Sequence, residues 1–189
     1  MVGIKSYGEA HLLSRNNKSF DGKYPAIGKA HARLPHETVI DGEVVALDES
    51  GMPSFNALQN GSATAQRYFY VFDVLVLAAY NVMAEPLPAR HEPLFHQVVP
   101  RRAEPIREAP QFDAGLPDLL RAVREQGLDG IVAGGLDSAY EPGQPSGVWR
   151  KMRVDRSQAF VIGVYTLGGR HFDALIFGYW EGDRKCRIL

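Results

Sequence analysis

The sequence has 189 residues, of which 45% are hydrophobic, enough to bury one core and part of a second. A formal net charge of -1 gives no indication for or against nucleic-acid binding, and the single cysteine, Cys186, excludes an internal disulfide. The most apolar stretch, 69–79, is interrupted by Asp73 and is too short to cross a bilayer, so we expect a cytoplasmic protein without a membrane partner.

The first residues predict a β-hairpin followed by a surface helix. Apolar segments at 2–4 and 10–13 flank a polar turn, which would carry Lys5. From residue 25 to 34 the apolar spacing is helical, with proline in the first turn, where its missing N–H costs little. We expect this helix to display Lys29, His31 and Arg33 on the surface.

Two longer strands follow. Residues 38–47 are rich in β-branched side chains and end in a turn signal. Residues 68–77 form the second strand, in which the two-residue period places Tyr68, Tyr70 and Phe72 on one face and Phe69, Val71 and Asp73 on the other. We expect this second strand to be covered on both sides.

Further along the chain, the sequence predicts two helices, a short strand, a loop and the start of another β module. The helices cover 90–98 and a segment from Leu116 that stops at Gly127. A short buried strand, 130–133, precedes a loop over 138–147 that is rich in proline and glycine. The last two strands, 159–165 and 174–180, open a module that the sequence does not close.

The strongest local motif is Ile40-Asp41-Gly42-Glu43-Val44-Val45, which sets two acids and a glycine inside an apolar strand. A buried carboxylate needs a partner, and Glu43 could hold a sugar hydroxyl or a metal-bound water. The alternative is a hairpin or bulge with exposed acids. Because short motifs are weak signals, this segment by itself favours the alternative.

Two further motifs carry charges that suit phosphate chemistry. Asp129 opens the strand at 130–133, and it could converge with Glu43 on one Mg²⁺, an ion that prefers oxygen ligands beside substrate phosphates. The alternative for Asp129 is a turn acid. In Trp149-Arg150-Lys151-Met152-Arg153, Lys151 and Arg153 share a strand face and could grip a phosphate, or could form a charged edge that resists aggregation. Phe72 is first a core aromatic and second a stacking surface for a base.

Taken in order, these segments resemble the ATP-dependent DNA ligases, particularly the bacterial end-joining type. The matching segments are Ser14-Arg15-Asn16-Asn17 (S-R-N-G), 40–45 (D-G-E), 68–74 (F-D), 129–133 (E-G-I-V-A), 136–143 (L-D-S-x-Y-E-P-G) and 149–153 (W-x-K-x-K). The resemblance covers nearly the whole chain and is weakest from 82 to 110. It implies an α+β nucleotidyltransferase (DNA ligase adenylation-domain) fold over residues 1–156, with antiparallel sheets flanked by helices. Residues 157–189 would be the first strands of an OB-fold barrel.

The resemblance also implies ATP and Mg²⁺ as cofactors and nicked or broken double-stranded DNA as partner, with end-joining proteins or a missing N-terminal segment as further partners. A lysine attacks the α-phosphate of ATP, AMP passes to the 5′-phosphate at a nick, and the 3′-hydroxyl then displaces AMP. Carried over residue by residue, Glu43 would hold the ribose, Phe72 would stack on adenine and Asp129 would help to place the metal. Lys151 and Arg153 would neutralise the α-phosphate, and Arg15 would contact the nucleotide or a DNA phosphate.

The sequence departs from the family at several positions. The nucleophilic lysine of K-x-D-G-x-R is absent and would precede Met1, because Lys5-Ser6-Tyr7-Gly8 lacks the aspartate and lies too near Ser14. Asp129 replaces the usual glutamate, and Gly134 and Gly135 replace K-R. We therefore expect a chain truncated at both ends that does not adenylate itself. The alternatives are a non-catalytic nucleotide- or DNA-binding remnant, and an RNA ligase or capping-type nucleotidyltransferase.

Overall fold

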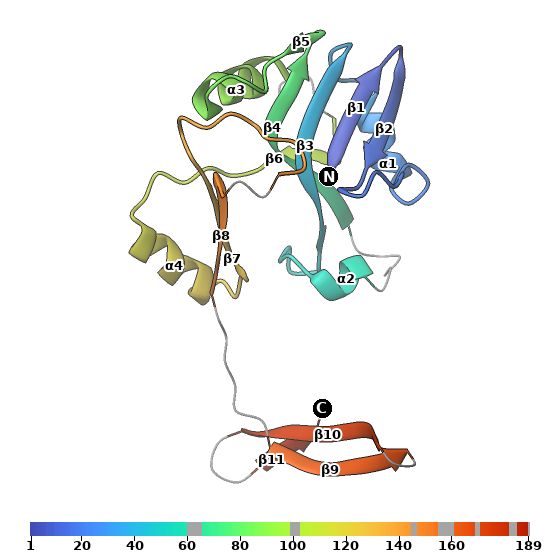
Figure 1. The fold of residues 1–189 in the computed structure, drawn as a ribbon, viewed down its shortest axis with the longest axis vertical. Helices are drawn as coiled ribbons and strands as arrows, with labels where there is room; N and C mark the ends of the chain where they lie inside the picture. The colour runs from blue at the N-terminus through green and yellow to red at the C-terminus, as the bar shows by residue number, and fades with distance from the viewer. Residues whose placement is uncertain are drawn as a thin grey trace. The chain divides into compact units, whose positions relative to one another are not determined.

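The computed structural model describes residues 1–59, 66–98, 103–144, 147–154, 161–168, 171–181 and 185–188 (Figure 1). By their contacts these residues divide into two compact units, Met1–Met152 and Arg153–Leu189. Antiparallel sheets and short helices make up the first unit, as the predicted α+β class requires. Each unit is described by itself. The boundary predicted at residue 156 stays a prediction.

The first unit is built on a six-stranded sheet. Its main path runs β2(Glu9–Leu13), β1(Val2–Ser6), β3(Thr38–Leu47), β4(Gln66–Leu77) and β5(Tyr80–Asn81), all antiparallel, while β6(Ile106–Glu108) pairs with β4 in parallel. The predicted hairpin and both predicted long strands are confirmed. Lys5, expected on a turn, instead lies within β1 and is 6% exposed.

Helices cover one face of this sheet and enclose the core. The core residues come from β2, α1(Pro25–His31), β3, β4 and the π-helix η1(Leu94–Val98), and include Leu12, Ile27, Ile40, Val44, Phe69 and Leu94. The expectation that α1 displays His31 on the surface is wrong, because that side chain is 1% exposed and packs against β1. Its ring fits there because Gly3 has no side chain: a Cβ on Gly3 would lie 2.7 Å from His31 Cε1.

The predicted helix at 90–98 begins earlier and changes type. It starts as α3(Leu87–Pro93), with Pro88 in the first turn, and continues as η1. Pro93 lies at the change, and its missing N–H and ring disfavour a regular α-helix at that point. The short helix α2(Phe55–Gln59) packs near β3 and was not predicted.

A smaller sheet follows the large one in the chain. Figure 1 shows β7(Gly130–Gly134) and β8(Trp149–Arg153) as a separate two-stranded sheet, and α4(Leu116–Glu125) contacts β7. The helix, its stop at Gly127 with φ of 73°, and the strand are where the sequence predicts them. The expected burial of this strand is wrong, since Val132 is 59% exposed.

The second unit is a three-stranded antiparallel sheet in the order β11(Lys185–Ile188), β10(His171–Glu181) and β9(Val161–Gly168). Two of these strands correspond to the predicted pair, and residues 159 and 160 lie outside the described residues. Cys186, near the end of the chain, falls in β11. Successive apolar residues along β9, such as Val161 and Ile162, are exposed, so both faces of this sheet present apolar side chains.

Candidate functional site

The D-G-E motif lies where β3 and β4 lose their regular register. Asp41 pairs with Asp73 and Gly42 pairs with Val71, which leaves Phe72 without a partner on β3. A β-bulge of this kind re-aims the side chain of the extra residue. The glycine is required by the close approach of the strands, because a Cβ on Gly42 would lie 2.5 Å from the backbone oxygen of Tyr70.

The bulge corrects the predicted face of Asp73. Residues directly opposite each other in an antiparallel pair share a face, so Asp73 lies on the same face as Asp41 and not with Phe69 and Val71. Alternation along β3 places Glu43 on that face too, opposite Tyr70, while Ile40 and the other buried residues point to the core. We call this the outer face of the large sheet. Glu43 is exposed there and has no hydrogen bond or ion pair among the described residues.

Phe72 connects the large sheet with the small one. Its ring centroid lies 5.7 Å from that of Trp149, the first residue of β8, with the ring planes at 52°. Lys151 follows two residues later and therefore shares the face of Trp149. The Phe72–Trp149 contact thus brings one face of β8 towards the part of β4 that borders Glu43. Lys151 is exposed and makes no hydrogen bond or ion pair within the described ranges.

Gly134 explains one departure from the family pattern. A Cβ at this position would lie 2.9 Å from Leu87 Cδ2 and 3.2 Å from the Trp149 ring. A basic side chain would therefore displace the packing that seats Trp149. Gly135 is less constrained, since the nearest atom to its Cβ would be Ser138 Cβ at 3.5 Å.

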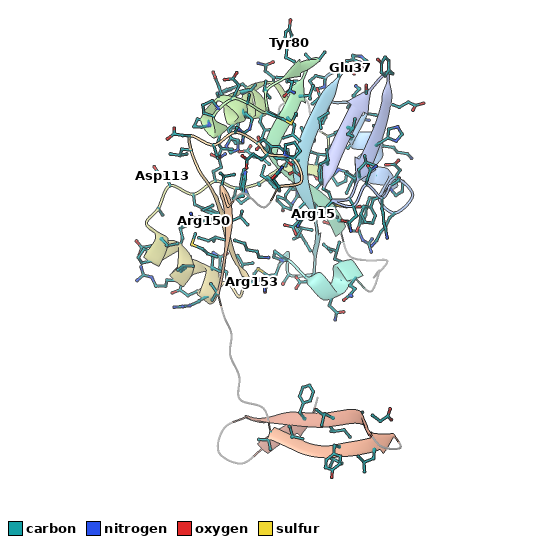
Figure 2. All side chains as sticks on the ribbon, in the orientation of Figure 1. Arg15, Glu37, Tyr80, Asp113, Arg150 and Arg153 are labelled. Carbon is teal, nitrogen blue, oxygen red and sulfur yellow. The ribbon has the colours of Figure 1, made fainter. Side chains whose placement is uncertain are left out.

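The remaining predicted residues occupy exposed positions. Arg15 lies in the turn after β2, in which the Ser14 N–H donates to the Lys18 oxygen at 2.9 Å (Figure 2). Asp129 directly precedes β7, and Arg153 ends β8. Convergence of these residues with Glu43 stays a prediction. A shallow pocket in the same unit is lined by Ala133, Gly134, Gly135, Gly147, Val148 and Arg150, and it includes none of the six predicted residues.

The sequence did not predict the polar network beside the bulge. Arg90 of α3 and Asp73 are both fully buried and form a two-pronged ion pair, Nε to Oδ1 and Nη2 to Oδ2, each at 2.9 Å. Nearby, the Tyr140 hydroxyl donates to Asp41 Oδ2 at 2.7 Å. The F-D segment signals Asp73, but no local pattern marks its partner in the region of weakest resemblance.

A second unpredicted cluster lies further along β4. The Arg107 guanidinium lies 3.5 Å from the ring centroid of Tyr68, also bonds to Tyr70, and donates to Glu104 at 3.2 Å. Because Tyr70 is opposite Glu43, this cluster borders the outer face. A cation over an aromatic ring is a geometry that also suits stacked bases. Arg107 lies in β6, which is too short to be recognised as a strand from the sequence.

Lys5 is oriented away from all of these groups. Val2 pairs with Asp41, so alternation along β1 places Lys5 on the core face, where its Nζ donates to the Leu34 oxygen at 2.5 Å. Its neighbour there is His31, whose two ring nitrogens have no hydrogen-bond partner among the residues that the structure describes. Lys5 therefore cannot reach a nucleotide held on the outer face.

Metal ligands are sparse in the described part of the chain. No group of three or more histidine, cysteine, aspartate or glutamate side chains is placed to hold a metal there. Mg²⁺ needs less, because it keeps several waters and binds through one or two carboxylates together with substrate phosphates. The exposed, unpaired Glu43 fits such a role. In the described helices no segment is long and apolar enough to cross a membrane.

Comparison with known proteins gives consistent results. The chain is 32% identical over 173 residues to the multifunctional non-homologous end joining protein LigD of Mycolicibacterium smegmatis. This match covers 86% of this chain and 21% of that protein. The chain is also 32% identical over 188 residues to the LigD of Pseudomonas aeruginosa, and this match covers 96% of this chain and 22% of that protein. The chain therefore spans about a fifth of the length of these curated relatives.

Solved structures agree with the sequence relatives. A mycobacterial DNA ligase D complexed with ATP and MES has a TM-score of 0.73 and 27% identity, covering 94% of this chain and 57% of that one. The ligase domain of M. tuberculosis LigD has a TM-score of 0.71 and 26% identity, covering 94% and 58%. These neighbours confirm the predicted nucleotidyltransferase and OB-type fold. Since the family model of the ATP dependent DNA ligase domain also matches residues 2–153, this chain belongs to the ATP-dependent DNA ligases of the bacterial end-joining type.

Proposed function

We propose that this chain binds ATP or AMP on the outer face of its large sheet and presents it to nicked or broken double-stranded DNA. The observation that carries this proposal is the contact between Phe72 and Trp149. It places the strand of Lys151 beside the strand pair that holds Glu43. An acid for the sugar, an aromatic ring for the base and a cation for the phosphate are thus available from adjoining elements.

The division of labour follows from the chemistry of each group. Phe72 offers adenine a ring held at a bulge, and stacking of a base on an aromatic side chain contributes about 1–3 kcal/mol. Glu43, which is exposed and has no partner in the described ranges, accepts hydrogen bonds from ribose hydroxyls. Lys151 and Arg153 provide positive charge for the α-phosphate, where charge increases during adenylyl transfer. Arg15 contacts the nucleotide or a DNA phosphate from the turn after β2.

Mg²⁺ would be held by Glu43 and Asp129 together with oxygens of the nucleotide. Bound there, the ion would neutralise phosphate charge during transfer. Asp129 is shorter than the glutamate of the family motif by one carbon-carbon bond, about 1.5 Å. We expect a water molecule to bridge the remaining distance between Asp129 and the ion, because Mg²⁺ readily retains bound water.

Covalent chemistry needs an acceptor lysine that faces the bound nucleotide. Lys5 is buried on the opposite face, so it does not fill this role. Its position favours a second candidate function, in which this chain by itself binds nucleotide or DNA without forming an adduct. Incubation with radiolabelled ATP and Mg²⁺ tests this second candidate, because a covalent adduct on this chain would exclude it.

Binding measurements test the site itself. We expect ATP with Mg²⁺ to bind the intact chain, and Phe72→Leu to weaken binding about tenfold, as loss of a stacked base implies. Phe112→Leu is the matched control, since Phe112 is an exposed residue far along the chain from the bulge. Equal effects of the two substitutions would contradict the proposed site. Nicked DNA and nicked RNA, compared over a range of salt concentrations, decide between a DNA ligase and an RNA ligase or capping-type enzyme.

A further inference from the structure

A short segment between the two sheets is held by several hydrogen bonds, one directly to the large sheet and others to α3 and the residues before it. This segment, residues 135–140, follows β7 and leads into the loop that returns to β8. We call it the strap. It is not part of any helix or strand, so its position depends on the bonds that hold it.

The first attachment is the buried Arg90 side chain. Two of its nitrogens are held by Asp73 at 2.9 Å, and Nη1 donates to the Ser138 oxygen at 2.8 Å and to the Glu85 oxygen. Val74 N–H donates to Asp73 Oδ1 at 2.9 Å, which fixes the carboxylate as well. Because Asp73 and the Glu85 oxygen fix the guanidinium in place, the Ser138 carbonyl that accepts from it has little freedom to move.

The second attachment is Tyr140. Its hydroxyl donates to Asp41 Oδ2 at 2.7 Å and its N–H donates to the Met83 oxygen at 2.8 Å. Burial, followed by the charge and the hydrogen bond of Asp41, raises the pKa of Tyr140, so the phenol keeps the proton that it donates. At the other end of the strap, Leu87 N–H donates to the Leu136 oxygen at 3.0 Å.

Both attachments end on residues of the bulge region. Asp41 belongs to the D-G-E motif and Asp73 follows Phe72, so the strap is held by the same strand segments that carry the proposed nucleotide contacts. β7 ends at Gly134, which fits closely between Leu87 and the Trp149 ring. The strap therefore connects β7 with the strand segments on either side of Phe72.

We infer that Tyr140 and Arg90 are positioning residues that hold Lys151 over the outer face, without touching the nucleotide themselves. This inference rests on the proposed function for the role of Lys151. The strap should therefore contribute to binding of the nucleotide's phosphates and should not contribute to binding of its adenosine.

The test uses Tyr140→Phe, which removes one hydroxyl and keeps the ring. Without nucleotide, we expect amide hydrogen exchange in β7 and β8 to become at least about fivefold faster, while exchange in β1 and β2 is unchanged. Tyr80→Phe is the control, since Tyr80 is 77% exposed in β5, where it pairs with Leu77 at the end of β4 (Figure 2). Unchanged exchange in β7 and β8 overturns the inference, whether or not the chain binds ATP.

Nucleotide binding then separates positioning from general loosening of the fold. We expect Tyr140→Phe to weaken ATP binding about tenfold, the loss expected for one hydrogen bond to a charged group, and to leave adenosine binding within about twofold. In a Lys151→Ala background the substitution should have little further effect. Equal losses for ATP and adenosine, or additive losses in the double variant, would overturn the inference. Failure of the unaltered chain to bind ATP contradicts the proposed function instead, and hydrogen exchange still decides the role of the strap.

Discussion

Acidification should destabilise this protein through His31. The ring is 1% exposed, packs against Gly3, and finds no hydrogen-bond partner for either nitrogen in the part of the chain that the structure describes. Burial, followed by the positive charge of Lys5, lowers the pKa of His31 from 6.5 to about 4. The folded protein therefore holds this histidine neutral, whereas the unfolded chain binds a proton readily below pH 6.5.

The sign and size of the effect follow from these values. Because the folded-state pKa is below the unfolded value, the stability contributed by neutral His31 is complete above pH 6.5 and is lost as the pH falls towards 4. The difference between 6.5 and about 4 corresponds to about 3 kcal/mol. This is a substantial part of the total stability of a domain of this size.

Urea unfolding at pH 7 and pH 4 measures the effect. Between pH 7 and pH 4, both proteins should lose stability, but the free energy of unfolding of His31→Leu should fall by about 3 kcal/mol less than that of the unaltered chain. The difference isolates His31, because the other titrating groups are common to both. His96→Gln is the control because His96 is exposed, and it should behave like the unaltered chain. The same loss of stability in His31→Leu and in the unaltered chain would refute the reasoning.

Three further predictions concern the bulge and its surroundings. In urea unfolding, Gly42→Ala should destabilise the fold by about 1–3 kcal/mol, because the new Cβ would lie 2.5 Å from the Tyr70 backbone oxygen. Gly28→Ala in α1 is the control and should be neutral or stabilising, because a Cβ there would meet none of the described atoms within 4 Å. Arg90→Met should cost about 3–5 kcal/mol by leaving Asp73 buried without its partner. Adding Asp73→Leu to Arg90→Met should recover the part of that loss that comes from the unpaired carboxylate, although the Ser138 and Glu85 oxygens stay without their donor. A double variant as unstable as the single one would contradict this account of the ion pair.

Local periodicity predicts most of the strands of this fold correctly. The alternation in 38–47 and 68–77 reflects a sheet with one face on the core, and the proline and glycine signals mark the ends of α1 and α4. Lys5 was misplaced because a polar residue next to Ser6 and Gly8 resembles a turn, although its strand carries it into the core. His31 was misplaced because helical spacing says nothing about a glycine on the strand opposite.

Long-range geometry could not be predicted in the same way. The bulge that turns Asp73 to the outer face depends on the register between β3 and β4, which no single segment encodes. The pairing of Arg90 with Asp73 joins a helix to a strand through a short buried contact. The motifs identified Glu43, Phe72 and Lys151 as candidates through a family resemblance. Their joint role stays a proposal, argued from the ring contact of Phe72 with Trp149.

The most direct test of the central claim is a crystal structure of this chain grown with ATP and Mg²⁺. The adenine ring should lie on Phe72, the ribose hydroxyls should bond to Glu43, and the α-phosphate should lie nearest Lys151. A nucleotide bound on the core-facing side near Lys5, or in the pocket beside Gly135 and Arg150 with Phe72 and Glu43 untouched, would contradict the account.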